Sequence, residues 1–340
     1  MTTVEPQPAP ATRLNLGYDK NLMLFSGRAN PALAARIAGK LGISPGPVTL
    51  RTFTNGEVYC RYGESIRGAD VFLVQPICAN PGEGMTPNDA IMELLLMIDA
   101  AVGASAHRVI AVVPWFGYSR QDKKSAPREP ISARLVARML ERAGADRVLT
   151  MDLHAGQIQG FFRKPVDHMT ALFILTQYFR DLGLRDLVVV APDAGRVKLN
   201  KKFASKLGAD LAILDKERPA QQVAEIGYVI GDVKGKTALI VDDIIDTAAT
   251  LKVASQTVLD AGARAVYAAA THPVLSGNAY ENLLGAGIEE IVVTDTIPLR
   301  AGAPDNIKVL SCAELLTDSI RSIFSDRSVS DVFGGENQLF

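Results

Sequence analysis

Short apolar runs alternate along the chain with longer segments in which apolar residues recur every three or four positions. Runs of four or five aliphatic residues are typical of buried parallel strands, and the longer spacing is typical of amphipathic helices. The predicted strands cover residues 22–25, 71–74, 109–113, 148–151, 187–191, 211–214, 238–241, 265–269 and 291–294. The predicted helices cover residues 89–102, 131–143, 169–182 and 250–261. This alternation predicts an α/β fold with mostly parallel sheets flanked by helices.

Two segments that begin at residues 141 and 259 share one pattern, ERAGADRVLTMDLH and LDAGARAVYAAATH. Chance similarity between alanine-rich segments is an alternative explanation, but the repeat favours two similarly folded halves. The proline-rich start of the chain indicates a flexible tail. We expect a tail at residues 1–19, a first domain at 20–166, a second domain at 167–312 and a second tail at 326–340, with a helix near 313–325 completing the first domain.

The balance of acidic and basic residues argues against nucleic acid and anionic membranes as partners. Lys and Arg number 36 against 37 Asp and Glu, a net charge of −1, so no global field favours nucleic acid or an anionic membrane. Three widely spaced cysteines show no metal-binding pattern and fit reduced thiols. No apolar stretch reaches membrane-spanning length, and the first residues lack a signal-peptide pattern. We expect a soluble cytoplasmic protein with no nucleic-acid or membrane partner.

The segment TALIVDDIIDTAATL at residues 237–251 carries the densest candidate chemistry. Its apolar start predicts a strand, which places Asp242 and Asp243 at the strand's carboxyl end, where open α/β sheets bind their ligands. The following residues 246–250 combine hydroxyls with small side chains, a pattern that suits an anion at a helix N-terminus. An ordinary helix N-cap is the plain alternative. The adjacent carboxylates favour a sugar diol or a divalent cation beside that anion.

Six motifs in this order resemble the ribose-phosphate pyrophosphokinase family, whose members are also called phosphoribosyl pyrophosphate synthetases. They read FTNGEVYCRYGESIRG, GYSRQDKK followed by REPISARLV, MDLHAGQIQGFF, APDAG, LDKERP and VDDIIDTAATL, and they span about residues 20–325. The resemblance implies two similar domains of the phosphoribosyltransferase type. It also implies transfer of the diphosphoryl group of ATP to the 1-hydroxyl of ribose 5-phosphate, which gives phosphoribosyl pyrophosphate and AMP.

The resemblance assigns roles to particular residues on both substrates. The ribose 5-phosphate site would comprise Asp242, Asp243, Asp246, Thr247, Ala248, Ala249 and Thr250. The ATP site would comprise Phe53, Asn55, Glu57, Arg120 and Gln121. Judged on residues alone, the Asn-Gly pair after Phe53 more strongly predicts a tight turn, and Arg120 a solvated surface arginine.

The cofactor and the catalytic cations also follow from the resemblance. Mg²⁺ would bridge the transferred phosphates, with His154 and Asp193 on the metal side. Because Mg²⁺ prefers oxygen ligands, Asp193 is the firmer contact and His154 can reach a bound water or phosphate instead. Lys216 and Arg218 would form the mobile catalytic loop that neutralises phosphate oxygens; a solvated charged loop is the alternative.

Regulation and assembly are further family expectations. Ser65, Arg67 and Arg128 are the candidate regulatory residues, with inorganic phosphate and ADP as effectors. The resemblance also implies homodimers that assemble into a hexamer, with the adenine site shared between subunits.

Several positions depart from the family pattern, including Ala248, Ala249 and Arg196. Ala248 and Ala249 stand where glycines are usual, so the loop either avoids positive φ there or binds phosphate less well. Arg196 stands where a second glycine is common, so the Asp193 loop differs in sequence from the usual family loop.

Two other functions remain open at this point. A phosphoribosyltransferase would use the same sugar loop without the ATP-side motifs. A non-catalytic subunit associated with true synthetases could keep the fold while losing the catalytic loop.

Overall fold

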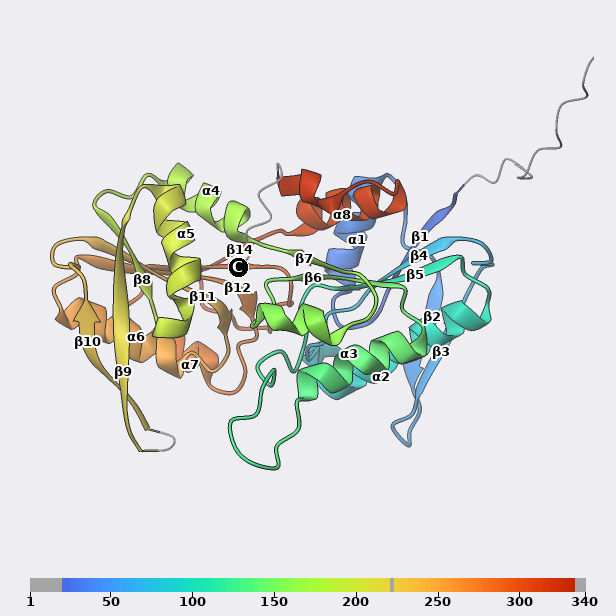
Figure 1. The fold of residues 1–340 in the computed structure, drawn as a ribbon, viewed down its shortest axis with the longest axis horizontal. Coiled ribbons are helices and arrows are strands. Elements are labelled where there is room, and N and C mark those ends of the chain that lie inside the picture. The colour runs from blue at the N-terminus through green and yellow to red at the C-terminus, as the bar shows by residue number, and fades with distance from the viewer. Residues whose placement is uncertain (1–19, 221–222, 334–340) are drawn as a thin grey trace, which may run out of the picture.

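A computed structural model describes residues 20–220 and 223–333, without the side chains of residues 216–227, 331 and 333. Figure 1 shows two sheets side by side along the long axis of the molecule, with helices above and below them. The fold is therefore α/β with mostly parallel sheets flanked by helices, as the sequence predicts.

The first sheet contains five parallel strands in the order β1-β4-β5-β6-β7. These strands are β1 (Leu22–Ser26), β4 (Asp70–Val74), β5 (Arg108–Val113), β6 (Arg147–Met151) and β7 (Val166–Met169). An antiparallel hairpin of β2 (Val48–Thr52) and β3 (Val58–Tyr62) projects from the far end of this sheet. Its helices are α1 (Pro31–Leu41), α2 (Pro87–Gly103) and α3 (Ser132–Ala143), with a 3₁₀ turn at Gly156–Phe161.

The second sheet contains seven strands in the order β10-β9-β8-β11-β12-β13-β14, and only the β9–β10 pair is antiparallel. They are β8 (Leu187–Ala191), β9 (Asp210–Ala220), β10 (Val223–Ile230), β11 (Thr237–Ile245), β12 (Ala265–Pro273), β13 (Glu290–Thr294) and β14 (Ile307–Leu310). The accompanying helices are α4 (Leu172–Leu182), α5 (Val197–Leu207), α6 (Ala249–Asp260) and α7 (Ala279–Leu284).

The last helix, α8 (Ala313–Phe324), returns to the first sheet and packs against α1. Its apolar face, which includes Leu316 and Ile320, is fully buried in the core layer that α1 also enters. Two polar contacts at the surface hold the pair in register. Lys40 Nζ lies 2.9 Å from Glu314 Oε2, and Arg321 Nη2 donates to the Lys40 carbonyl at 2.6 Å. The expected division after residue 166 falls at the start of β7, and the domain limits stay a prediction.

Apolar packing joins the two sheets into one body. One layer contains buried residues of α1, α8, α4 and α5 together with strands of both sheets, including Phe72 of β4 and Leu239 of β11. The opposite faces have separate cores, one under α2 and α3 and the other under α6 and α7. A shared layer of this kind ties the relative position of the sheets to the burial of their apolar side chains.

The two sheets differ in how the chain orders their strands. In the first sheet, successive strands lie next to one another from β1 to β7. In the second sheet, β9 lies on one side of β8 and β11 lies on the other, so the direction of winding reverses between β8 and β11. Open α/β sheets bind ligands at such a switch point, beyond the carboxyl ends of the strands. This rule points to the end of β8 and β11.

The nine strands predicted from apolar runs are all present, and so are the four predicted helices. The hairpin strands and the edge strands β7, β10 and β14 were not predicted, nor were α1, α5 and α7. Short edge strands have partly exposed, mixed sequences and lack the continuous apolar pattern of buried strands. The repeated segments at residues 141 and 259 occupy matching positions, because each runs from the end of a helix, α3 or α6, into β6 or β12.

Candidate active site

A cavity of about 260 Å³ lies at the switch point of the second sheet. The ends of β8 and β11 and the N-terminus of α6 form its walls, and Arg120 and His154 reach it from the first half of the chain. Its polar lining side chains are Arg120, His154, Asp193, Arg196, Asp242, Asp243, Asp246, Thr247 and Thr250. Eight predicted site residues other than the sugar loop's alanines therefore line one cavity, together with Arg196, for which the sequence predicted no role.

Asp242 and Asp243 lie near the end of β11, with Asp243 buried and Asp242 half-buried. The Asp243 backbone N–H donates to Asp242 Oδ1 at 2.8 Å. Burial and the neighbouring charge of Asp243 raise the pKa of Asp242 well above its usual range. Burial acts in the same direction on Asp243, but the hydrogen bond with His154 and the charge of Arg196 outweigh it and lower its pKa. The two adjacent carboxyls therefore ionise at different pH values, with Asp243 the more acidic.

Arg196 binds both of these carboxylates. Its Nε lies 3.0 Å from Asp242 Oδ1, and its Nη2 lies 2.7 Å from Asp243 Oδ1. The guanidinium is fixed at the end of the 3₁₀ turn Ala194–Arg196, directly before α5, and its side chain is only 16% exposed. A planar guanidinium is suited to such paired contacts, because its N–H groups form a fixed fork.

His154 lies beside the same carboxylate pair. Its Nδ1 is 2.9 Å from Asp243 Oδ2 and 2.6 Å from Arg196 Nη2. Because one ring nitrogen either donates or accepts, Nδ1 can donate to the aspartate or accept from the arginine, but not both at once. Arg196 and Asp243 thus compete for the same atom of His154.

The loop at residues 246–250 leads from β11 into α6, and its geometry settles one open question. Ala248 has φ +59°, so this alanine does occupy the left-handed region, which excludes the first of the two alternatives, a loop that avoids positive φ. The left-handed conformation costs about 1–2 kcal/mol for a residue with a Cβ. Ala249 is the first residue of α6 and needs no such conformation.

The N-terminus of α6 opens on the cavity. Within the described residues, no side chain caps its first N–H groups, while Thr250 and Leu251 of its first turn line the cavity. Uncapped N–H groups at the start of a helix of this length can bind an anion. The loop itself is held from outside, since Asn282 Nδ2 donates to the Thr247 carbonyl at 2.9 Å.

Arg120, from the first half of the chain, contacts the loop at residues 246–250. Its Nη2 lies 2.6 Å from Asp246 Oδ2, and Ser276 Oγ donates to Asp246 Oδ1. Arg120 is therefore a cavity residue as well as an exposed one, which separates it from the solvated surface arginine considered above. Gln121 is directed elsewhere, because its Oε1 accepts a hydrogen bond from Ser132 Oγ at 2.6 Å.

The donor set of the cavity fits a hard divalent cation. Asp193, Asp242 and Asp243 contribute carboxylate oxygens to one cavity, and such oxygens are the ligands that Mg²⁺ prefers. Within residues 20–220 and 223–333, no three His, Cys, Asp or Glu side chains form a ready-made metal site. An ion here would therefore keep most of its waters or bind ligand oxygens.

The other predicted ATP residues lie outside the cavity. Phe53, Asn55 and Glu57 belong to the turn of the β2–β3 hairpin, where the predicted tight turn forms: Gly56 has φ +90°, and the Phe53 N–H donates to the Glu57 carbonyl at 2.7 Å. Phe53 is 42% exposed, and the Arg51 guanidinium stacks 5.0 Å from its ring centre. Figure 1 places this hairpin at the opposite end of the long axis from the β9–β10 ribbon.

Two further groups of predicted residues are also outside the cavity. The backbone of Lys216 and Arg218 belongs to strand β9 rather than to the predicted loop, and Lys216 pairs with Ile226 of β10. The side chains of both residues lie outside the described part of the chain. Ser65, Arg67 and Arg128 are exposed, the first two in the loop between β3 and β4 and the third at φ +74° before α3.

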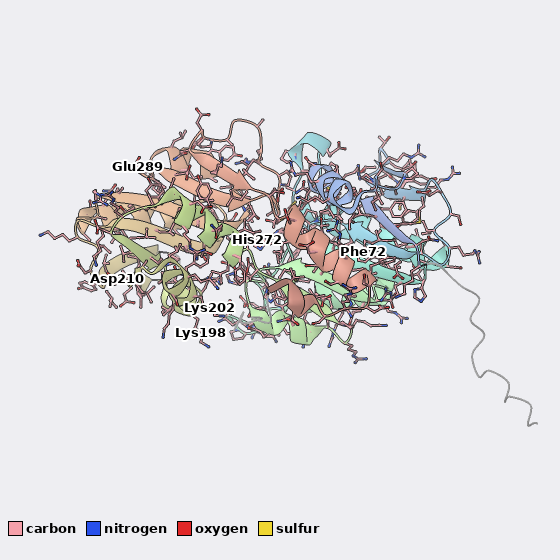
Figure 2. The ribbon with its side chains drawn as sticks, turned by 90° about the horizontal axis from the view of Figure 1, so that it is seen from above. Phe72, Lys198, Lys202, Asp210, His272 and Glu289 are labelled. Atoms are coloured by element: carbon pink, nitrogen blue, oxygen red, sulfur yellow. The ribbon has the colours of Figure 1, made fainter. Side chains whose placement is uncertain are left out.

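A buried polar network behind the cavity links the two sheets. Asp152, which follows β6 with φ +32°, accepts hydrogen bonds from Thr271 Oγ1 at 2.6 Å and from the Ala171 N–H at 2.8 Å. His272 Nε2 lies 3.2 Å from the carbonyl oxygens of Met151 and Asp152. Figure 2 shows His272 near the middle of the molecule. This network holds the chain segment from which His154 emerges.

The fold and this cavity define a class: an α/β protein with two sheet-containing domains of the phosphoribosyltransferase type. Residues 22–144 match the family model for the N-terminal domain of ribose phosphate pyrophosphokinase, and residues 220–334 match that for the phosphoribosyl synthetase-associated domain. No helix in the described ranges has the length and apolar character that crossing a bilayer requires.

Curated relatives and a solved structure match nearly the whole chain. It is 51% identical over 318 residues to the ribose-phosphate pyrophosphokinase of Caldanaerobacter subterraneus subsp. tengcongensis, covering 93% of this chain and 99% of that protein. It is 47% identical to that of Gloeobacter violaceus, covering 96% and 98%. The crystal structure of phosphoribosylpyrophosphate synthetase from Mycobacterium smegmatis matches with a TM-score of 0.84 at 45% identity, covering 90% of this chain and 100% of that one. The chain belongs to the ribose-phosphate pyrophosphokinase family.

Proposed function

We propose that this chain transfers the diphosphoryl group of ATP to the 1-hydroxyl of ribose 5-phosphate, giving 5-phosphoribosyl 1-pyrophosphate and AMP for nucleotide biosynthesis. In this reaction the 1-hydroxyl oxygen attacks the β-phosphorus of ATP, and the hydroxyl proton is released to solvent. The bond from that phosphorus to the α,β-bridging oxygen breaks, and AMP leaves with the bridging oxygen. The observation that carries the proposal is the cavity at the β8–β11 switch point, which combines an acid pair with an open helix N-terminus.

The cavity would bind the acceptor. The 5-phosphate would lie on the N–H groups of residues 247–250 at the start of α6, where an anion is favoured. The ring hydroxyls would donate to Asp242 and Asp243, which lie at the end of β11 on the same cavity. Asp246, Thr247, Ala248, Ala249 and Thr250 would form the phosphate loop, with Asp246 held by Arg120. This arrangement would direct the 1-hydroxyl towards the donor side.

Mg²⁺ would act with the donor phosphates. Asp193 would bind it, with His154 reaching a metal-bound water or a phosphate oxygen. When bound, the ion neutralises charge on the transferred phosphates and polarises the β-phosphorus. Arg120, exposed on one side and facing the cavity on the other, would bind the phosphates of ATP.

The adenine would be bound at a subunit boundary. Of the described residues that line the cavity, none comes from the hairpin that carries Phe53, Asn55 and Glu57. We therefore propose that these residues, with Gln121, serve a site completed by a neighbouring subunit in homodimers that assemble into a hexamer. An exposed aromatic ring on a projecting hairpin suits stacking on a base.

The remaining roles rest on the motifs. Lys216 and Arg218 on β9 would neutralise the non-bridging oxygens as the bond breaks, without a dedicated general base, since such transfers depend on positioning and electrostatics. Ser65, Arg67 and Arg128 would bind phosphate or ADP as effectors. The protein would act in the cytoplasm.

AMP release tests the proposed reaction. Purified protein with ATP, Mg²⁺ and ribose 5-phosphate should release AMP in equal amount to the 1-diphosphate product, followed by ³¹P NMR. Omitting ribose 5-phosphate should abolish AMP release. Activity that requires a free base and consumes phosphoribosyl pyrophosphate, or activity only after adding a second synthetase, would overturn the proposal.

A further inference from the structure

Arg196 links three of the residues to which the proposed reaction assigns roles. Its guanidinium contacts Asp242, Asp243 and His154 at 3.0, 2.7 and 2.6 Å, respectively. It also lies 3.4 Å from the His154 carbonyl through Nη1. Each of these groups faces the same cavity. A single side chain therefore occupies the places where ligands of the acid pair would bind.

Three carboxylate oxygens of the acid pair are already engaged. Asp242 Oδ1 accepts from the Asp243 N–H at 2.8 Å and from Arg196 Nε. Asp243 Oδ1 faces Arg196 Nη2, and Asp243 Oδ2 faces His154 Nδ1 at 2.9 Å. A second cation that approached these oxygens would meet a fixed positive charge within contact distance. Coulomb repulsion at such separations is screened less than in bulk water, because the side chains of Arg196 and Asp243 are largely buried.

We propose that Arg196 is a resident counter-ion that keeps free divalent cations off the Asp242–Asp243 pair until a phosphate ligand offers its guanidinium another anion. The inference rests on the proposed function, and it adds an order of events to it: the metal enters with the phosphate-bearing substrates. Arg196 acts on the metal through the acid pair, so it is a positioning residue. At the position where glycines are common in the family, this chain therefore carries its own cation.

The anionic partner that releases Arg196 has a defined place. The N-terminus of α6 opens on the same cavity as the guanidinium, so a phosphorylated ligand bound there brings negative charge into reach of Arg196. Phosphate oxygens accept two parallel N–H groups from an arginine as carboxylates do. Exchange of one anion for another preserves the paired contacts of the guanidinium while it frees the carboxylates. Because Arg196 contacts either the acid pair or the phosphate, phosphate binding and cation binding are coupled, and each should strengthen the other.

Direct metal binding to the full chain, without nucleotide or sugar, tests the inference. Mn²⁺ serves as the probe and free Mn²⁺ is measured by electron paramagnetic resonance. Arg196→Met keeps an unbranched side chain about as long as the aliphatic stem of arginine and removes the charged guanidinium. We expect Arg196→Met to bind Mn²⁺ at least tenfold more tightly than the wild-type chain. Equal affinity for the two proteins would overturn the inference.

Two controls separate a specific exchange from a general change of charge. Arg120→Met removes a cation from the other side of the cavity and should change Mn²⁺ affinity less than threefold. Adding Asp242→Asn to Arg196→Met should return the affinity to the wild-type value. A gain with Arg120→Met as large as that with Arg196→Met, or a gain that survives Asp242→Asn, would contradict the role of the acid pair.

If Arg196→Met does not fold, Arg196→Lys carries the test. A lysine keeps the charge but cannot span both carboxylates, so Mn²⁺ should bind at least threefold more tightly than to the wild-type chain; no change would overturn the inference. The wild-type chain offers a further measurement, because inorganic phosphate should tighten Mn²⁺ binding to it but not to Arg196→Met. None of these readouts requires turnover. Failure of AMP release with intact Mn²⁺ results would count against the proposed reaction alone.

Discussion

The end of β4 in the first sheet and the end of β8 in the second occupy matching places but have opposite characters. The strands β6 and β12 belong to the two repeated segments, and β4 lies two strands from β6 as β8 lies two strands from β12. Gln75, after β4, is fully buried, and it accepts from the Ala29 N–H at 3.0 Å and donates to Glu93 Oε1 at 2.9 Å. Asp193, after β8, instead lines the cavity.

Chain order explains this difference. The strands of the first sheet follow one another without reversal, so neighbouring loops pack together and their polar groups satisfy one another. The winding of the second sheet reverses between β8 and β11, which separates the loops at that point and leaves room for a ligand. In the same type of fold, the end of β4 is therefore filled by buried polar contacts, whereas the end of β8 lines a cavity. Substitutions on the two sides should therefore separate stability from activity.

Glu93→Ala should have the largest effect on stability. Glu93 is fully buried and its Oε2 lies 2.6 Å from Arg28 Nε, so the substitution leaves a largely buried arginine without its partner. We expect a loss of about 3–5 kcal/mol in the free energy of unfolding, measured by urea denaturation. The exposed Glu314, which pairs with Lys40, offers a control, since Glu314→Ala should leave the urea midpoint nearly unchanged. A loss below about 1 kcal/mol for Glu93→Ala would mean that the Glu93–Arg28 pair does not hold the end of β4.

Asp193→Asn should have the reverse effect, a large loss of activity with little change in stability. If the carboxylate binds the metal–phosphate complex, kcat for AMP release should fall about 100- to 1000-fold, which corresponds to about 3–4 kcal/mol. The urea midpoint should stay close to that of the wild-type chain, because the side chain faces a cavity. The exposed Asp305→Asn should leave kcat within about twofold. Asp193→Asn with near-normal kcat but reduced stability would make Asp193 a structural residue like Gln75.

Acid should lower the free energy of unfolding through His168, which lies on β7 of the first sheet. Burial, with a smaller contribution from His272, lowers the pKa of His168 to about 4, and its Nε2 accepts from the Leu153 N–H at 2.7 Å. The unfolded side chain has a pKa of about 6.5, so between these values the unfolded state binds the extra proton. The stabilising contribution is complete above pH about 6.5 and is lost as the pH falls towards 4, by about 3 kcal/mol.

Urea unfolding at several pH values measures this loss. His168→Gln keeps an acceptor for the Leu153 N–H and cannot take up a proton in this range. Its free energy of unfolding should therefore fall less steeply than that of the wild-type chain between pH 6.5 and 4. Parallel pH profiles for the two proteins would contradict the assignment to His168.

Ala248→Gly should have the smallest effect and the opposite sign. Glycine adopts the φ of +59° at this position without steric cost, so the substitution should stabilise the chain by about 1 kcal/mol. The neighbouring Ala249→Gly is a matched control, because it lies in the first turn of α6 and should destabilise by up to about 1 kcal/mol. Destabilisation by Ala248→Gly would show that the loop does not strain its alanine.

The sequence was sufficient for the buried strands and for the acid pair. Continuous aliphatic runs specify parallel strands, and the residues that follow them fall at one edge of the sheet, which is why Asp193 and Asp242 could be placed together. The role of Arg196 was not predictable, because its contacts join β8 and β11 through a loop whose geometry the sequence left open. The hairpin position of Phe53 was predictable as a turn, but its distance from the cavity depends on tertiary packing.

The positive φ of Ala248 shows a further limit of sequence reasoning. Residue preference favoured negative φ, yet the connection from β11 to α6 imposes the left-handed conformation. Tertiary geometry outweighs a local cost of this size, since about 1–2 kcal/mol is small beside the burial of the flanking strand and helix.

The central claim is that the β8–β11 switch point binds the sugar phosphate. A crystal structure of the chain soaked with ribose 5-phosphate tests it most directly. The account predicts the phosphate on the N–H groups of residues 247–250 and the ring hydroxyls at Asp242 and Asp243, with the Arg196 guanidinium moved off the acid pair. Sugar phosphate bound at the strand ends of the first sheet instead, with Arg196 still on Asp242 and Asp243, would contradict it.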